Sequence, residues 1–206
     1  MRAFIYVGGD VNTQMITEHP KGDDIVLCAD AGYENAKRLG ERADIFVGDM
    51  DSYTGELDEK LQVVRLKPEK DVTDTQAAFE LAVEKGADDI IIIGGLSGRL
   101  DHTMANLSVL EDANARRIHC LITDGNNRVR FIRDDSTLLG RSQFKYFGLI
   151  AADETVKGVE IKGAKYCVER AKLSRRTGGF SVSNEIDGNC AFIAVKKGGV
   201  FIIESN

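Results

Sequence analysis

Residues 90–102, IIIIGGLSGRLDH, decide the fold, because four isoleucines run directly into a glycine-rich turn. A short, continuous run of β-branched apolar residues is typical of a strand buried on both faces. Beyond the turn, the apolar residues Leu100, Met104, Leu107 and Leu110 recur at spacings of four, three and three, which predicts an amphipathic helix beginning near Leu100. The segment is therefore a strand, a turn and a helix, the repeating unit of a parallel α/β sheet.

A second helix is predicted just upstream of this segment. Thr73 and Gln76 form a T-x-x-Q capping box, and Gly86 stands where a glycine commonly ends a helix. Between them, apolar residues at 77, 78, 81 and 82 form a stripe with helical spacing. We therefore expect a helix between Thr73 and Gly86.

The same alternation of short apolar runs with helical segments extends over the first 125 residues. The runs that we expect to be strands are residues 3–7, 25–29, 44–47, 63–66, 90–93 and 119–122. Strands that alternate with helices in this way indicate parallel βαβ units. We predict an α/β domain over residues 1–125 with a mostly parallel sheet.

From residue 126 the pattern changes to short strands separated by glycines. The expected strands are residues 129–132, 144–150, 156–161, 165–168, 180–182, 192–195 and 200–203. The last two flank residues 196–199 and are predicted to pair as a hairpin. Because no helical period occurs here, we predict a small all-β domain over residues 126–206.

The composition excludes several classes of protein. Of the 206 residues 43% are apolar, enough for a core, so the chain is not disordered. Its 27 basic and 33 acidic residues give a net charge of −6, which argues against a nucleic-acid partner. The longest apolar run, Ile90 to Ile93, is too short to cross a membrane. We therefore expect a cytoplasmic protein with no membrane partner.

The four cysteines, Cys28, Cys120, Cys167 and Cys190, suggest no chemistry. They include no C-x-x-C pair and have no accompanying histidine cluster, so neither a zinc site nor a disulfide framework is indicated. Cys28 and Cys120 lie within apolar runs, where a buried structural cysteine is expected.

Acidic residues follow the predicted strands throughout the first domain. The segments after the runs contain Asp10; Asp30; Asp49 and Asp51; Lys70, Asp71 and Asp74; and Arg99, Asp101 and His102. The carboxyl ends of parallel strands meet at one edge of a sheet, where ligands bind. Carboxylates gathered there would repel one another unless a divalent cation lay among them, and oxygen ligands alone point to Mg²⁺. With Lys70 and Arg99 to hold phosphate oxygens, the pattern predicts a Mg²⁺-nucleotide site.

Each of these features also has a simpler explanation. The D-x-D pair Asp49 and Asp51 is compatible with a polar turn, and Asp74 with a favourable charge at a helix N-terminus. His102 is compatible with an ordinary helix-surface histidine. The functional interpretation therefore depends on the set as a whole.

The ordered set of motifs resembles the thiamine pyrophosphokinase (thiamine diphosphokinase) family, whose members transfer a pyrophosphoryl group from ATP to thiamine and release AMP. The motifs are residues 29–32 (ADAG), 47–52 (VGDMDS), 70–75 (KDVTDT), 94–102 with Asn106 and Leu107, and 183–185 (SNE). They occur in the family's order and spacing over nearly the whole chain.

The resemblance implies a nucleotide-binding α/β domain, a C-terminal β-sandwich domain that binds thiamine, and a homodimer whose active sites are shared between subunits. It implies the following roles: Asp49, Asp51 and Asp74 as Mg²⁺ ligands; Asp30, Lys70, Arg99, Asp101 and His102 at the ATP site; Asp71, Asp101 and Arg99 in catalysis; and Ser183 and Asn184 facing thiamine.

Two departures from the family pattern concern the metal loop and the thiamine site. Met50 stands where the family often has phenylalanine, a swap that should leave the neighbouring carboxylates in place. The chain has no tryptophan, which some members stack on the thiamine ring. An aromatic such as Phe180, Tyr166 or Tyr146, or an aliphatic wall, would replace it.

The motifs leave alternatives for the reaction. In the leading hypothesis the hydroxyl of thiamine attacks the β-phosphorus of ATP, and Asp71 or Asp101 orients or deprotonates that hydroxyl. The same site could serve another heterocyclic alcohol, such as a pterin. A D-x-D glycosyltransferase would leave Asp71 and Asp74 without a role, and a non-catalytic sensor predicts missing metal ligands, whereas none is missing. Release of AMP from Mg-ATP and thiamine separates these hypotheses.

Overall fold

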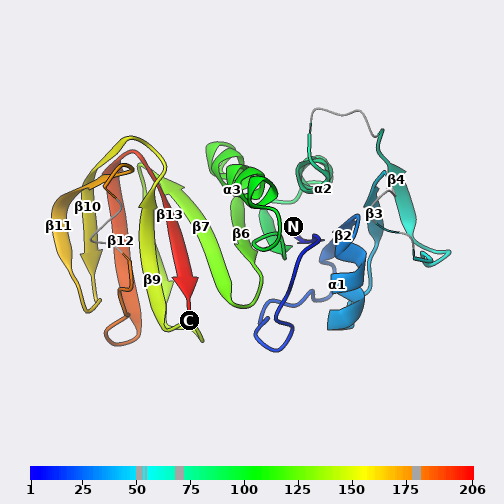
Figure 1. The fold of residues 1–206 in the computed structure, drawn as a ribbon, viewed down its shortest axis with the longest axis horizontal. Coiled ribbons are helices and arrows are strands. Elements are labelled where there is room, and N and C mark those ends of the chain that lie inside the picture. Colours follow the sequence, from blue (N-terminus) through cyan, green and yellow to red (C-terminus); the bar gives the residue numbers. More distant parts are fainter. Residues whose placement is uncertain (50–52, 54, 68–71, 178–181) are drawn as a thin grey trace. The chain divides into compact units, whose positions relative to one another are not determined.

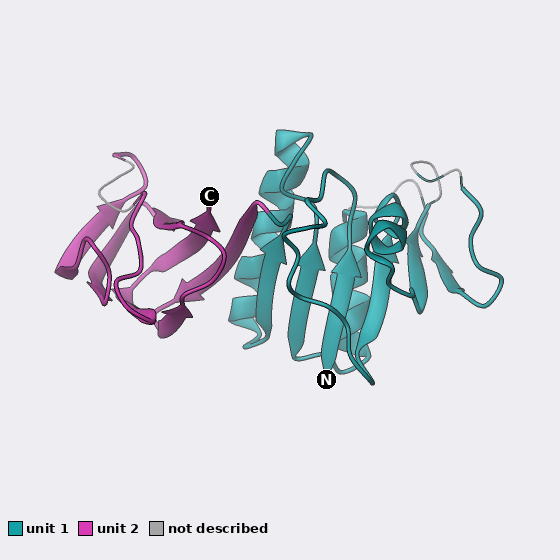
Figure 2. Cartoon of the chain, turned by 90° about the horizontal axis from the view of Figure 1, so that it is seen from below, with its two compact units in different colours: residues 1–125 teal, residues 126–206 magenta. Residues whose placement is uncertain are grey.

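The computed structural model describes residues 1–49, 53, 55–67, 72–177 and 182–206. Its contacts divide the chain into two compact units, Met1–Gly125 and Asn126–Asn206, coloured separately in Figure 2. All helices of the described chain belong to the first unit, and the second is built from strands (Figure 1).

In the described residues of the first unit, six strands pair in parallel and three helices connect or follow them. In chain order its elements are β1 (Arg2–Tyr6), β2 (Ile25–Ala29), α1 (Gly32–Leu39), β3 (Ile45–Gly48), β4 (Gln62–Arg65), α2 (Asp74–Glu84), β5 (Asp89–Ile93), α3 (Leu100–Ala115) and β6 (His119–Thr123). The strands lie in the order β4-β3-β2-β1-β5-β6, and every pairing among them is parallel. The predicted parallel sheet is therefore confirmed, but the alternation with helices is only partial, since no helix is described between β1 and β2 or between β3 and β4.

The isoleucine run forms β5, which pairs with β1 on one side and with β6 on the other. Ile90, Ile92 and Ile93 are completely buried. Burial of each such side chain contributes about 1.5–3 kcal/mol relative to exposure. Successive strand residues face opposite sides of the sheet, so alternate ones such as Ile91 and Ile93 join the cluster that includes Tyr33 and Ala36 of α1. The sheet is therefore apolar at β5, and α1 packs in the same cluster as Ile91 and Ile93.

The capping signals of α2 operate as predicted. The Thr73 side-chain oxygen accepts a hydrogen bond from the backbone N–H of Gln76 at 3.2 Å, and Gly86 has a φ of +91° just beyond the helix. The predicted start of α3 near Leu100 is also confirmed.

The apolar stripe predicted for α3 is only partly correct. Leu110 is 1% exposed, but Leu100 is 73% and Met104 49% exposed. The buried residues of α3 are Asn106, Val109, Leu110 and Ala113. The buried residues thus lie in the later turns of the helix, and the apolar side chains near its start remain exposed.

The second unit consists of two antiparallel sheets. Its strands are β7 (Asn127–Arg133), β8 (Ser136–Gly140), β9 (Tyr146–Ala151), β10 (Thr155–Lys162), β11 (Val168–Ser174), β12 (Cys190–Lys197) and β13 (Gly199–Ser205). Strands β7, β13 and β9 pair in that order, and the other sheet has the order β11-β10-β12-β8. Both sheets contribute to one core, which includes Leu149 and Ile202 from the first and Val159 and Ile193 from the second. The fold class is the predicted α/β domain followed by a β sandwich.

The predicted hairpin at residues 196–199 is wrong. Strand β12 pairs with β10 and β8, whereas β13 pairs with β7 and β9 in the other sheet. The chain crosses between the sheets at Gly198, which has a φ of +105°. Its N–H donates to Asp134 Oδ1 at 2.6 Å, and the N–H of Gly199 donates to Asp153 Oδ2 at 2.9 Å. These side chains hold a corner between sheets, which local sequence does not distinguish from a hairpin turn.

Three further strand assignments differ from expectation. Strand β11 begins at Val168, so the strand predicted at 165–168 is displaced toward the C-terminus, and β8 was not predicted at all. In the strand predicted at 180–182, residues 180 and 181 lie outside the described residues, and Val182 is in a bend.

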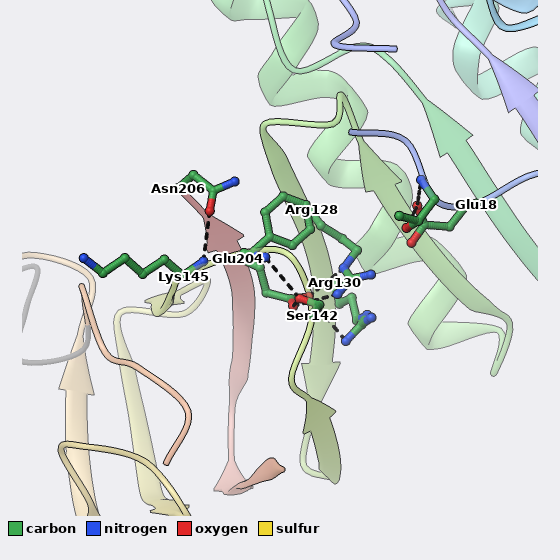
Figure 3. A network of polar contacts seen from close by, with 9 residues as sticks. Glu18, Arg128, Arg130, Ser142, Lys145, Glu204 and Asn206 are labelled. Atoms are coloured by element: carbon green, nitrogen blue, oxygen red, sulfur yellow. Dashed lines mark hydrogen bonds and ion pairs between the residues drawn. The ribbon is translucent and has the colours of Figure 1, made fainter. Parts of the chain in front are cut away.

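A buried ion pair joins two strands of the second unit (Figure 3). Arg128 of β7 lies opposite Glu204 of β13, and its Nε and Nη2 each donate to that carboxylate at 2.7 Å. Ser142 Oγ donates to the same carboxylate at 3.0 Å. Glu204 is 2% exposed, so the arginine compensates a charge that would otherwise be costly to bury.

Within the described chain, no helix combines the length and the apolar character needed to cross a membrane. All four cysteines are free; Cys28 is completely buried, as predicted, whereas Cys120 is only half-buried. Burial raises the pKa of the Cys28 thiol to about 12, so this thiol stays protonated at neutral pH.

Candidate active site

Two adjoining cavities lie beyond the carboxyl ends of the parallel strands. One, of about 260 Å³, is lined by two glycine-rich loops, at residues 8–10 and 94–98, together with Thr75, Arg99, His102 and Asn106. The other, of about 200 Å³, is lined by Asp30, Thr73, Asp74, Thr75 and His102 among others. Val7, Gly8, Thr75 and His102 border both. The predicted position of the site at this edge of the sheet therefore coincides with real space for a ligand.

Two glycine loops form the wall of the larger cavity. The first, residues 8–10, follows β1, and the second, residues 94–98, follows β5. The N–H of Gly95 donates to the carbonyl of Gly8 at 3.0 Å, and the N–H of Asp10 donates to Ser97 Oγ at 2.7 Å. A Cβ at Gly9 would lie 2.8 Å from that Ser97 oxygen. Glycine is needed where the two loops approach this closely.

Asp30 sits at the end of β2 in a strained and buried position. Its φ is +44°, and only 6% of the residue is exposed. A Cβ at Gly48, at the end of β3, would lie 2.2 Å from Asp30 Oδ1. Because Gly48 of the neighbouring strand has no side chain, there is room for the carboxylate of Asp30. Asp30 lines the smaller cavity.

Asp74 borders the same cavity from the start of α2. It is the first residue of that helix and follows the cap at Thr73. A helix N-terminus has unpaired N–H groups and a partial positive charge, which favour a carboxylate or a bound anion nearby. The structure therefore brings Asp30 and Asp74, from two separate motifs, to one cavity.

Arg99 and Asp101 form an exposed ion pair at the start of α3. Arg99 Nη2 donates to Asp101 Oδ2 at 2.6 Å, and the N–H of His102 donates to Asp101 Oδ1 at 2.9 Å. The hydrogen bond from Arg99 is the main reason that the pKa of Asp101 is lowered. Arg99 and His102 line the larger cavity, whereas Asp101 lines neither of the two.

The remaining acidic and basic candidates are less completely described. Asp49 directly follows β3 but lines neither cavity. Asp51, Lys70 and Asp71 lie outside the described residues. Within the part of the chain that the structure describes, no three Asp, Glu, His or Cys side chains form a group able to hold a metal.

The donors nevertheless have the chemistry that Mg²⁺ requires. Asp30 and Asp74 bring hard carboxylate oxygens to a cavity of about 200 Å³, and Asp49 directly follows β3, the strand next to that of Asp30. No cysteine lines this cavity. Oxygen donors around an open space fit Mg²⁺, which keeps several waters and shares its shell with phosphates.

Ser183 and Asn184, in the second unit, have different surroundings. Ser183 is exposed and has a φ of +60°. Asn184 is 2% exposed; its Nδ2 donates to the carbonyl of Tyr166, and its Oδ1 accepts from the N–H groups of Tyr166 and Glu185. The asparagine amide is thus engaged with backbone, while Tyr166 itself is 54% exposed.

Sequence reasoning assigned no role to Asn35, Thr75 or Ser97. Asn35 and Thr75 are buried, and Thr75 and Ser97 line the cavities. One signal was available for Asn35, because it lies beside Ala36 on the buried face of its helix. A polar residue in that position needs a hydrogen-bond partner, and here the partners are loop carbonyls.

Comparison with known proteins agrees with this architecture. The family described as thiamin pyrophosphokinase, catalytic domain, matches residues 17–122, and the family described as thiamin pyrophosphokinase, vitamin B1 binding domain, matches residues 136–200. Each match falls within one of the two compact units.

Similar individual proteins carry the same name. Thiamin pyrophosphokinase 1 of Caenorhabditis elegans is 29% identical over 178 residues, covering 82% of this chain and 72% of its own. Thiamine pyrophosphokinase of Bacillus subtilis is 26% identical over 166 residues, covering 77% of this chain and 76% of its own.

The fold is also that of solved structures. The crystal structure of thiamine pyrophosphokinase from Bacillus subtilis has a TM-score of 0.88 at 22% identity and covers 100% of this chain and 99% of its own. The Candida albicans enzyme has a TM-score of 0.77 at 17% identity, with coverages of 100% and 90%. Since the two matched domains span most of the sequence, the chain belongs to the thiamin pyrophosphokinase family of enzymes.

Proposed function

We propose that this protein is a thiamine diphosphokinase, which transfers a pyrophosphoryl group from ATP to the hydroxyl of thiamine. The observation that carries the proposal is the cavity that joins Asp30 and Asp74 and adjoins the loops and Arg99. The match to both a catalytic and a vitamin B1 binding domain supports thiamine as acceptor. No observation favours a pterin alcohol.

The proposed reaction forms one phosphorus–oxygen bond and breaks another. The thiamine hydroxyl oxygen attacks the β-phosphorus of ATP, its proton goes to a base or to solvent, and the bond to the α-phosphate oxygen breaks. The products are thiamine diphosphate and AMP. Phosphoryl-type transfer depends mainly on positioning and charge stabilisation, so the chain must hold the phosphates and align the hydroxyl.

Positive groups and backbone amides are proposed to hold the phosphates. Arg99 lines the larger cavity and donates two hydrogen bonds to Asp101, which is proposed to orient it. His102 borders both cavities and is proposed as a further ATP contact. Lys70, outside the described residues, retains its proposed place at the phosphates.

Asp49, Asp51 and Asp74 are proposed to hold Mg²⁺, with Asp30 beside them. The ion would supply charge neutralisation along the phosphate chain. Asp30 and Asp74 are brought together across a cavity by two different elements, which supports a shared role.

Asp71 and Asp101 are the candidates for handling the hydroxyl proton. A general base works best when its pKa lies near the operating pH. Because Arg99 lowers the pKa of Asp101, that carboxylate is a weak proton acceptor at neutral pH. We therefore propose that Asp101 orients Arg99 and that Asp71 is the better candidate for contact with the hydroxyl.

Thiamine recognition is proposed to involve Ser183, with Asn184 as the residue that holds the local backbone. Ser183 is exposed, whereas the amide of Asn184 is engaged with Tyr166 and Glu185. Exposed Tyr166 is a candidate for stacking in a chain that has no tryptophan. A homodimer with shared active sites, a cytoplasmic location and the absence of a nucleic-acid or membrane partner remain predictions.

The decisive experiment is to mix the protein with Mg-ATP and thiamine and to identify both products. We expect thiamine diphosphate and AMP in equal amounts. Asp74→Asn should abolish turnover while leaving the melting temperature without ligand unchanged or higher, because it removes one of several neighbouring negative charges. Glu84→Gln, at the exposed far end of the same helix, is the matched control and should keep wild-type activity. Formation of ADP and thiamine monophosphate would contradict the pyrophosphoryl assignment.

A further inference from the structure

Two buried asparagines lie behind the two glycine loops of the larger cavity. Asn35 belongs to α1 and is 4% exposed; Asn106 belongs to α3 and is 5% exposed. Each occupies a position on the buried face of its helix, where an apolar side chain would pack. A polar group at such a site is costly unless it is hydrogen-bonded, so its partners indicate why it is there.

Asn35 of α1 donates hydrogen bonds to the backbone of the first glycine loop. Its Nδ2 donates to the carbonyl of Val7 at 2.8 Å and to that of Gly9 at 2.9 Å. Its Oδ1 accepts from Arg38 Nη1 at 3.1 Å, and Arg38 Nη2 donates to the carbonyl of Val11 at 3.3 Å. One turn of α1 therefore holds three alternate carbonyls of the segment that follows β1.

The direction of these carbonyls determines the direction of the intervening N–H groups. In a trans peptide the C=O of one residue and the N–H of the next point in opposite directions. With the carbonyls of Val7 and Gly9 turned toward α1, the N–H groups of Gly8 and Asp10 point away from it. The N–H of Asp10 indeed reaches Ser97 Oγ at 2.7 Å. In the described chain no group accepts a hydrogen bond from the N–H of Gly8, a residue that lines both cavities.

Asn106 holds the second glycine loop in the same way. Its Nδ2 donates to the carbonyl of Gly95 at 2.9 Å, and a Cβ at Gly95 would lie 2.5 Å from that nitrogen. The N–H of Gly95 in turn donates to the carbonyl of Gly8 at 3.0 Å. The two helices, the two asparagines and the two loops thus form one continuous hydrogen-bonded frame around the cavity.

We propose that Asn35 and Asn106 are positioning residues for the nucleotide: they hold the two loops so that the N–H of Gly8 stays available to the phosphate chain. The inference rests on the proposed function, in which ATP occupies this cavity. Loops fixed before binding lose less conformational entropy when the ligand arrives, so the frame should increase affinity for ATP and leave the thiamine side unaffected.

The test uses Asn35→Asp and Asn106→Asp, which retain side-chain size but replace the donating amide. Asn114→Asp, the same substitution two turns further along α3, is the matched control, because none of the described contacts uses its side chain. For each protein we would measure the dissociation constant of Mg-ATP by calorimetry, the KM values for ATP and thiamine, kcat and the melting temperature.

We expect both Asp variants to weaken Mg-ATP binding and raise the KM for ATP about tenfold or more, because buried carbonyls lose their donors. The KM for thiamine and the control variant should stay within about twofold of wild type, which is well below one tenfold step. A merely structural role would instead lower the melting temperature and kcat while leaving the nucleotide constants unchanged, and that result would overturn the proposal.

Two further measurements keep the outcomes distinct. If an Asp variant does not fold, Asn35→Ser or Asn106→Ser, which removes the amide without adding charge, is judged by the same constants. If wild type binds Mg-ATP but forms no thiamine diphosphate, the proposed function fails, and the calorimetry still tests the asparagines. If wild type is active and the folded variants bind Mg-ATP normally, only the positioning proposal fails.

Discussion

At the scale of single residues, the site depends on positions where a side chain is absent. Gly48 has no Cβ, and the space that it leaves holds the carboxylate of Asp30, which adopts a positive φ of +44°. The sequence pattern places an aspartate after β2, but the pattern does not show that its position depends on a glycine in the next strand. A strained residue of this kind persists because the surrounding structure determines it, and such residues are frequent at active sites.

We predict that Gly48→Ala displaces Asp30 and lowers kcat/KM between about 10- and 100-fold, as expected when a group that positions the substrate moves by about an ångström. The new methyl carbon would lie 2.2 Å from Asp30 Oδ1, so the carboxylate must move. Gly140→Ala is the matched control, since a Cβ there meets nothing within 4 Å. Steady-state kinetics on both variants check this, and normal activity of Gly48→Ala would show that the position of Asp30 is unimportant.

At the scale of elements, helix α2 places Asp74 at the cavity, and its cap determines where the helix begins. The capping box was readable from the sequence because both of its residues are local. The apolar stripe of α3 was less informative, since Leu100 and Met104, near the start of the helix, are exposed. Local signals thus locate the ends of a helix better than they identify the face that becomes buried.

Thr73→Ala should destabilise the first unit by about 1 kcal/mol, because it removes the acceptor for the N–H of Gln76. Thr73→Ser keeps that oxygen and should retain most of the stability. Urea unfolding at constant m value would measure the difference. Equal stability of the Ala and Ser variants would mean that the cap contributes nothing here.

At the scale of the whole molecule, the second unit depends on charged groups that join its strands. Asp153 binds Arg133 through two hydrogen bonds of 2.7 and 3.0 Å and accepts the N–H of Gly199. The hydrogen bond from Arg133 is the main reason that the pKa of Asp153 is lowered. Because the folded-state pKa lies below the unfolded value of about 3.9, this pair stabilises the fold above that pH.

Arg133→Met should therefore lower the stability at pH 7 by about 0.2–1 kcal/mol, a modest amount because both side chains are partly exposed. As the pH falls below about 4 and toward the folded-state pKa, Asp153 takes up its proton and the difference between variant and wild type should shrink. Denaturant unfolding at a series of pH values measures this. A difference that stays constant down to pH 2 would mean that the charge of Asp153 is not responsible.

The sequence by itself determined the class of the fold and the ends of α2, and it predicted at which edge of the sheet the site lies. These features follow from local patterns: the period of the apolar residues, the glycines at turns, and helix caps whose residues lie close together in the sequence. The aspartates could be placed at one edge of the sheet because parallel strands all end there. The order of motifs then indicated the family, which the domain matches confirm.

Only the tertiary structure decided which sheet each C-terminal strand joins and what holds the loops of the site. Strands β12 and β13 are consecutive in sequence, yet they pair with β10 and β7. Asn35 contacts a loop 26 to 28 residues away, and Asn106 a loop 11 residues away. Such contacts are selected by packing and hydrogen-bond satisfaction between distant segments, and no local pattern carries that information.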